Sequence, residues 1–184
     1  MAEKIEEAPD MKEVFAYFGR TAYMANVLEV ALAQTLLQVE FMTNLRATVL
    51  KNQGSDFDRA KYENEFDDYY EKQLGKTMGQ LVKKVEEFPD LNDEMKQKIK
   101  DALARRNHLT HNYWREQAYT FLTVEGRAAM ITELSKDTDT FEKLASDIMD
   151  ATQAVRKRLG ISEGKLNAGV EKQLADLQDG MVLE

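Results

Sequence analysis

Apolar residues recur at steps of three and four along most of this chain, and few residues interrupt the pattern. The longest such stretch runs from Met11 to Leu50. Two prolines and nine glycines in 184 residues leave few points at which a helix must end. Strong helix formers such as leucine, alanine, glutamate and lysine are abundant. We therefore expect an all-α fold, an antiparallel helical bundle with long first and last helices.

The same pattern divides the chain into three parts. We expect residues 1–10 to be a flexible leader, residues 11–161 to form the bundle, and residues 162–184 to form a tail or a short docking helix. A chain of this length buries enough surface to fold without a metal or a disulfide. Turn residues, prolines and capping residues then predict helices over 11–50, 74–88, 91–113 and 125–159, with a turn at 51–55, Asp90 as a helix cap and a break at 120–126.

Residues 56–71 form an acidic segment that is also rich in aromatic side chains. One interpretation is a loop or short helix whose aromatic side chains pack against the bundle. The other is a contact surface or lid. The sequence leaves the role of this segment open.

Composition excludes several classes of protein. The chain has no cysteine, which rules out disulfides, thiolate metal sites and cysteine nucleophiles. No apolar run approaches the roughly 20 residues of a membrane span, and the N-terminal residues are acidic where a secretory signal is basic. We expect a cytoplasmic protein that does not bind membranes. The net charge of −8 argues against broad adhesion to nucleic acid but allows a local basic site.

One basic segment stands out against this acidic background. Residues 95–115 carry six lysines and arginines against a single aspartate, and both histidines of the chain lie within them. Histidine transfers protons near neutral pH, and arginine presents a fork of donors that suits phosphate. The segment therefore indicates a site for cleavage of a phosphate ester without a metal.

Helical geometry places the candidate side chains on different faces. At about 100° per residue, Arg106 falls inside the apolar stripe of its helix, so its charge points toward the core or another chain. His111 shares a face with Asn107 and lies about 140° from Arg106. The length of the arginine, a local distortion or a second copy of the helix must therefore bring the two groups together.

The series Arg106-Asn107-x-x-x-His111-x-Tyr113 resembles the R-x4-6-H signature of the HEPN superfamily, and the tyrosine matches the R-x4-H-x-Y variant of HepT-like toxins. The order of helices over roughly residues 11–160 is also similar to that of HEPN bundles. The resemblance implies a metal-independent endoribonuclease whose composite cleft forms in a homodimer. It further implies a toxin or defence role and a nucleotidyltransferase-type antitoxin as a partner.

The resemblance assigns a role to each matching residue. His111 is expected to act as general acid and base, Arg106 to hold the scissile phosphate, and Asn107 to orient the imidazole or bind a phosphate oxygen. Tyr113 matches the position that the antitoxin modifies. The remaining polar residues of the segment are expected to contact RNA, namely Arg105, His108, Arg115 and Lys100.

Each candidate residue also has a structural interpretation. His111 can be an ordinary surface histidine, and Arg106 can pair with one of the many carboxylates. His108 falls on the polar side of the helix and is expected to be solvated. Tyr113 and Trp114 are expected to pack rather than to stack on bases. No third ligand accompanies the two histidines, so we expect no metal and no cofactor.

Two other functions stay open at this point. The first is a non-catalytic HEPN-type module that binds RNA, nucleotide or protein. The second is a helical interaction protein in which Arg106 and His111 pair structurally across a dimer.

Overall fold

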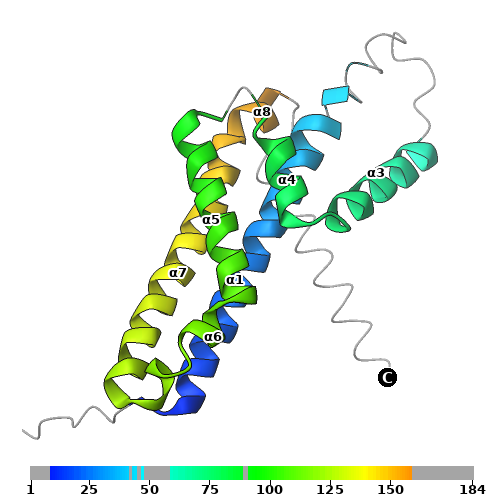
Figure 1. Ribbon diagram of the computed structural model, residues 1–184. Coiled ribbons are helices and arrows are strands. Elements are labelled where there is room, and N and C mark those ends of the chain that lie inside the picture. The colour runs from blue at the N-terminus through cyan, green and yellow to red at the C-terminus, as the bar shows by residue number, and fades with distance from the viewer. Residues whose placement is uncertain (1–8, 42, 45–46, 48–58, 89–90, 159–184) are drawn as a thin grey trace, which may run out of the picture.

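The part of the chain that the computed structural model describes (Figure 1) comprises residues 9–41, 43–44, 47, 59–88 and 91–158. Within these ranges every regular element is a helix, which confirms the all-α fold. No helix among them combines the length and the apolar character needed to cross a bilayer. Outside the described residues lie most of the predicted leader, the turn at 51–55, Asp90 and the predicted tail.

The first helix, α1 (Met11–Leu36), extends along the whole bundle (Figure 1). Asp10 caps it by accepting a hydrogen bond from the backbone N–H of Glu13 at 2.7 Å. A π-helical turn, η1 (Leu37–Phe41), follows directly. Because π-helical bonding runs from i to i+5, the uniform α-helix expected over 11–50 is interrupted before its predicted end.

The long helix α7 (Val124–Ala151) packs beside α1 over most of its length. Between them, the buried hydroxyl of Thr21 lies 2.9 Å from the carbonyl oxygen of Leu134, to which it donates, and 2.9 Å from Oγ1 of Thr138. The two long helices run in the same direction (Figure 1). The chain returns between them through α5, which runs antiparallel to both.

Helix α5 (Asp93–His111) carries the predicted site residues. Asn92 caps it by accepting a hydrogen bond from the backbone N–H of Met95 at 2.8 Å. The prediction that Asp90 is the cap is therefore wrong, because Asn92 is the residue whose side-chain oxygen reaches the third amide of the helix.

Two of the predicted helices end earlier than expected. Helix α5 gives way to a short helix, α6 (Tyr113–Glu116), after Asn112, and α7 gives way to α8 (Gln153–Arg158) after Thr152. The Thr152 hydroxyl donates to the carbonyl oxygen of Ile148 at 3.2 Å. Such hydrogen bonds from a side chain to the backbone compete with the hydrogen bonds of the helix. The spacing of apolar residues in the sequence does not reveal them.

Helix α4 (Met78–Val85) is shorter than the helix expected over 74–88. It begins at Thr77, whose hydroxyl accepts from the Gln80 N–H while the Gln80 side chain accepts from the Thr77 N–H. This capping box sets the start of the helix more strongly than the apolar residue Leu74 does.

The acidic and aromatic segment forms the helix α3 (Arg59–Leu74), which extends away from the bundle (Figure 1). Its Tyr69 ring lies 5.2 Å from that of Phe41, and its hydroxyl donates to Glu40 at 2.7 Å. Lys84 of α4 donates to the same carboxylate at 3.0 Å. Among the described residues, α3 therefore packs through Tyr69 on the turn that follows α1, and its role as a contact surface or lid stays open.

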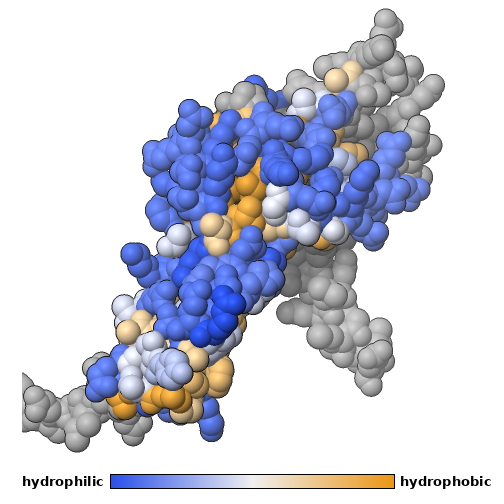
Figure 2. Space-filling view, in the orientation of Figure 1, coloured by the Kyte–Doolittle hydropathy of each residue, from blue (hydrophilic) through white to orange (hydrophobic). Residues whose placement is uncertain are grey.

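The core of the bundle is apolar and draws on α1, α4, α5, α6 and α7. Its largest fully buried apolar side chains are Tyr113, Phe141, Leu28, Leu32, Leu36, Met78, Leu81, Ile99, Met130, Leu134 and Ile148. Figure 2 shows hydrophilic residues over most of one face, with an apolar strip in the hollow between α4 and α5. A second apolar area marks the end of the bundle at which α1 begins.

Candidate functional site

The first candidate residue, Arg106, faces α1 as its place in the apolar stripe predicts. Its Nη2 atom lies 3.6 Å from Oε2 of Glu29, and its Nη1 atom donates to Oδ1 of Asn107 at 3.3 Å. The side chain is 30% exposed. Both contacts are longer than a good charge-assisted hydrogen bond, so Arg106 is held loosely and keeps donors available.

The second candidate residue, His111, is the last residue of α5 and is exposed. No hydrogen bond, ion pair or ring contact joins its imidazole to any other residue that the structure describes. Its neighbour Asn112 donates its backbone N–H to the carbonyl oxygen of His108 at 2.9 Å. The imidazole of His111 is therefore open to a substrate or to a second protein chain.

The structure does not bring Arg106 and His111 into contact within one chain. The polar neighbour of Arg106 on its own helix is Asn107, one turn before His111. This arrangement agrees with the separation of about 140° that an ideal helix gives the two residues. One chain by itself does not assemble the site that the motif implies.

The adjacent arginine, Arg105, has a very different environment. Its Nε atom donates to Oδ2 of Asp137 at 2.8 Å, its Nη2 atom to the same oxygen at 2.5 Å, and Nη2 also donates to Oε1 of Glu133 at 2.6 Å. Burial disfavours the charged form, but the hydrogen bonds that Arg105 donates to Asp137 and Glu133 outweigh it and raise the pKa of Arg105. Arg105 therefore ties α5 to α7, and its contact with RNA stays a prediction.

His108, which we expected to be solvated, is 30% exposed and has two hydrogen-bond partners. Its Nδ1 atom lies 3.0 Å from Nη1 of Arg105, and its Nε2 atom lies 2.8 Å from Oε2 of Glu116. The hydrogen bond from His108 lowers the pKa of the Glu116 carboxyl. Helix angles alone do not reveal this, because Glu116 approaches His108 only after the chain breaks at Asn112.

Tyr113 packs in the core, as its structural interpretation predicts. Its ring stacks on Phe18 with centroids 5.7 Å apart, and its side chain is completely buried. Burial, together with the nearby Glu133 charge, raises the pKa of the Tyr113 hydroxyl. Because the hydroxyl is not presented to solvent, modification of Tyr113 requires α6 to move.

The predicted basic surface is largely neutralised by carboxylates from other positions. Lys100 lies 3.4 Å from Glu86, which follows α4. Arg115 is exposed and donates to Oδ1 of Asn112 at 2.9 Å. Both side chains are exposed, and their contact with RNA stays a prediction.

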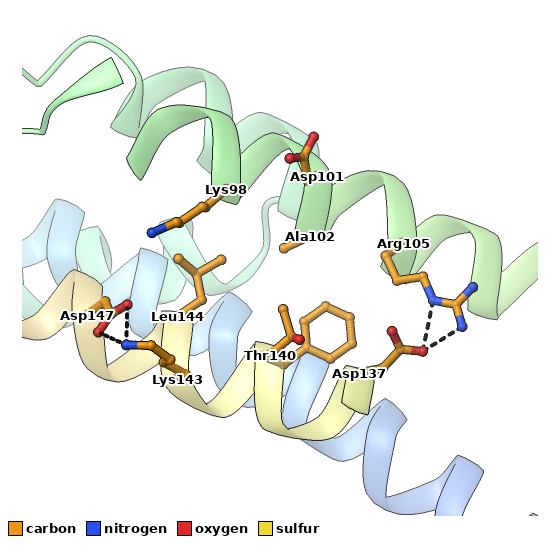
Figure 3. A pocket seen from close by; sticks show the side chains of 10 residues that line it. Lys98, Asp101, Ala102, Arg105, Asp137, Thr140, Lys143, Leu144 and Asp147 are labelled. Atoms are coloured by element: carbon orange, nitrogen blue, oxygen red, sulfur yellow. Dashed lines mark hydrogen bonds and ion pairs between the residues drawn. The ribbon is translucent and has the colours of Figure 1, made fainter. Parts of the chain in front are cut away.

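A cavity of about 350 Å³ lies between α5 and α7 beside Arg105. Figure 3 shows the Arg105–Asp137 pair at one end and the Lys143–Asp147 pair at the other. Apolar side chains such as Leu144 form its floor. Its charged side chains already have partners, and among the described residues no group of three or more His, Cys, Asp or Glu is placed to hold a metal ion.

Sequence reasoning missed the carboxylates around the site, which are Glu29, Glu116, Glu133 and Asp137. Nothing in the local pattern marks them, because acidic residues are common throughout this chain. Comparison of the chain with protein-family models, with curated proteins and with solved structures finds no match.

Proposed function

We propose that this protein is a metal-independent endoribonuclease of the HEPN type that acts on RNA as a homodimer. The single observation that carries the proposal is the environment of one helix end. There Arg106 is partly exposed and loosely paired, and His111 is exposed and has no partner among the described residues. A guanidinium with available donors can bind a phosphodiester, and an exposed imidazole can transfer protons during its cleavage.

The proposed reaction is an internal transesterification. His111 as a general base takes the proton of the ribose 2′-hydroxyl, and the 2′-oxygen bonds to phosphorus. The bond from phosphorus to the 5′-oxygen breaks, and that oxygen takes a proton from an imidazolium. The products are a 2′,3′-cyclic phosphate and a free 5′-hydroxyl. Arg106 stabilises the charge that develops on the phosphate oxygens, and Asn107 orients the imidazole of His111 or binds a phosphate oxygen.

A second copy of the chain supplies the missing geometry in this proposal. Arg106 and His111 make no contact within one chain, and the partly exposed guanidinium of Arg106 lies near Glu29 of α1. In a homodimer the guanidinium of one chain and the imidazole of the other converge on one phosphate. The resemblance to HEPN proteins supports this arrangement independently of the helix angles.

The biological setting rests on the resemblance alone. It supports a cytoplasmic toxin or defence component with a nucleotidyltransferase-type antitoxin. Purification of the protein with an adjacent gene product of that class, followed by mass spectrometry of Tyr113, tests this part. An unmodified Tyr113 in the inhibited complex would contradict it.

RNA cleavage in EDTA tests the activity. We expect the wild-type protein to cleave RNA and leave cyclic phosphate ends, and His111→Ala and Arg106→Ala to abolish cleavage. The matched control is Gln97→Ala, an exposed position on the same helix about 21 Å from His111. It should cleave as the wild type does, and circular dichroism should show the same helix content in all four proteins.

Other outcomes select the alternatives. RNA that binds but survives indicates a non-catalytic binding module. If RNA neither binds nor is cleaved, and the Arg106→Ala and His111→Ala variants both melt at lower temperature than Gln97→Ala, the protein is a helical interaction protein. The contact of Arg106 with Glu29 is the observation that favours this last alternative.

A further inference from the structure

His108 joins two helices across the break next to the proposed catalytic residue. It lies in the last turn of α5, and its imidazole contacts Arg105 on the same helix and Glu116 on α6. We name these contacts the histidine bridge. They extend over Asn112, where α5 ends and α6 begins without a side-chain cap.

The donors and acceptors determine which ring nitrogen of His108 carries the proton. A guanidinium can only donate, so Nδ1 of His108 must accept from Nη1 of Arg105 over their 3.0 Å separation. The proton then belongs on Nε2, which donates to the Glu116 carboxylate at 2.8 Å. The bridge therefore selects one tautomer of the imidazole, with Nδ1 as acceptor and Nε2 as donor.

The groups that face His108 come from three helices. An N–H on Nδ1 would meet the N–H of Arg105 head on, so Nδ1 is the acceptor of the bridge. On the other side of the ring, Glu116 accepts from Nε2. From α7, Glu133 and Asp137 face Arg105 rather than His108, and the edge of the imidazole meets the ring of Tyr113 at 6.2 Å.

The bridge connects α6 to the most strongly held point of α5. Arg105 is bonded to Asp137 and Glu133 of α7, so the contacts run from α7 through Arg105 and His108 to Glu116. His111 lies inside the segment that this series of contacts encloses. Because no described residue holds the His111 side chain, the backbone of this segment sets where its imidazole lies.

We infer that His108 is a positioning residue: through Arg105 and Glu116 it fixes the junction of α5 and α6, and thereby orients His111 for the reaction. The part of this inference that concerns the reaction rests on the proposed function. The part that concerns the bridge does not, so the two are tested by separate measurements.

Nuclear magnetic resonance of nitrogen-15 in the imidazole rings tests the bridge. The chain has only two histidines, and His111→Ala assigns the remaining signals to His108. At neutral pH we expect His108 to show one protonated nitrogen, Nε2, and one acceptor nitrogen, Nδ1, whereas His111 should show the averaged signals of an open imidazole. Averaged signals for His108, or a protonated Nδ1, overturn the inference.

Variants of Glu116 test the consequence for His111. Glu116→Ala should shift the His111 resonances and lower kcat at least about tenfold with little change in KM, since misplacement by 1 Å can cost about 100-fold. Glu116→Gln keeps an acceptor oxygen for Nε2 and should restore most of the loss. The control is Glu87→Ala, which removes the same charge from an exposed position after α4 and should change neither quantity.

The possible results separate the inference from the proposed function. If the wild type does not cleave RNA, the proposed function fails, and the His108 tautomer and the His111 shifts in Glu116→Ala still decide the inference. If the wild type cleaves RNA and Glu116→Ala alters neither kcat nor the His111 signals, the inference fails and the proposed function stands. A loss in Glu116→Ala that Glu116→Gln does not restore also overturns it.

Discussion

The Arg106 guanidinium lies 3.6 Å from the Glu29 carboxylate, too far for a good hydrogen bond and close enough for an ion pair. Both side chains are partly exposed, and such pairs contribute about 0.2–1 kcal/mol. Glu29 therefore neutralises Arg106 at rest without holding it firmly. An incoming phosphate would compete with Glu29 for the same donors.

Removal of this competitor should improve RNA binding. We expect Glu29→Gln to lower the KM for RNA by up to about fivefold, because a pair worth at most about 1 kcal/mol is lost. Steady-state cleavage at constant salt measures the effect. The control is Glu87→Gln, an exposed position that follows α4. It makes the same charge change and should lower KM less than Glu29→Gln does. A KM that rises in Glu29→Gln would show that Glu29 orients Arg106 instead.

Mixing two inactive variants tests whether the site is shared between chains. Arg106→Ala and His111→Ala should each be inactive alone, and a mixture that is unfolded and refolded together should regain part of the wild-type activity. In such heterodimers one cleft combines the intact Arg106 of one chain with the intact His111 of the other. Light scattering should show a dimer, and a mixture that stays inactive would place both residues in one chain.

The adjacent arginines should differ sharply in their effect on stability. Arg105→Ala leaves Asp137 and Glu133 unpaired at a partly buried position and should lower the free energy of unfolding by about 2–4 kcal/mol. Arg106→Ala should lower it by only about 0–1 kcal/mol. Urea denaturation followed by circular dichroism measures both. Equal losses would contradict the different environments described above.

The hydrogen bonds of the Glu40 carboxylate should make a pH-dependent contribution to stability. Burial alone would raise its pKa, but the hydrogen bonds from Tyr69 and Lys84 outweigh burial and lower it below the ordinary 4.5. A lowered pKa in the folded state means that the contribution is present above pH 4.5 and is lost as the pH falls through the folded-state value. The stability difference between wild type and Glu40→Gln should therefore shrink on acidification. A difference that stays constant down to pH 3 would contradict this.

Two glycines should respond in opposite ways to alanine. A Cβ at Gly126 would lie 1.9 Å from the carbonyl oxygen of Thr120, in the 3-10 turn η2 (Thr120–Leu122) that precedes α7. Gly126→Ala should therefore destabilise the protein by about 1–3 kcal/mol. Gly19, inside α1, has open space around it, and Gly19→Ala should stabilise the protein by about 0.5–1 kcal/mol. Thermal denaturation of the pair checks both signs.

Local sequence patterns were sufficient to predict the all-α class, the break at 120–126 and the place of Arg106 in the apolar stripe. These features are local, because helical periodicity and turn residues act over a few positions. The same patterns did not predict the ends of α5 and α7, where Asn112 and Thr152 interrupt helices whose apolar pattern continues.

Long-range packing determines which of the two arginines forms strong ion pairs within the fold. Arg105 and Arg106 are neighbours in sequence, and their partners Asp137 and Glu29 lie on different long helices. A helix turns its successive side chains by about 100°, so packing between α1 and α7 sends the two guanidinium groups to different surroundings. The parallel course of those helices depends on contacts distant in sequence, such as Thr21 with Thr138, which no local pattern encodes.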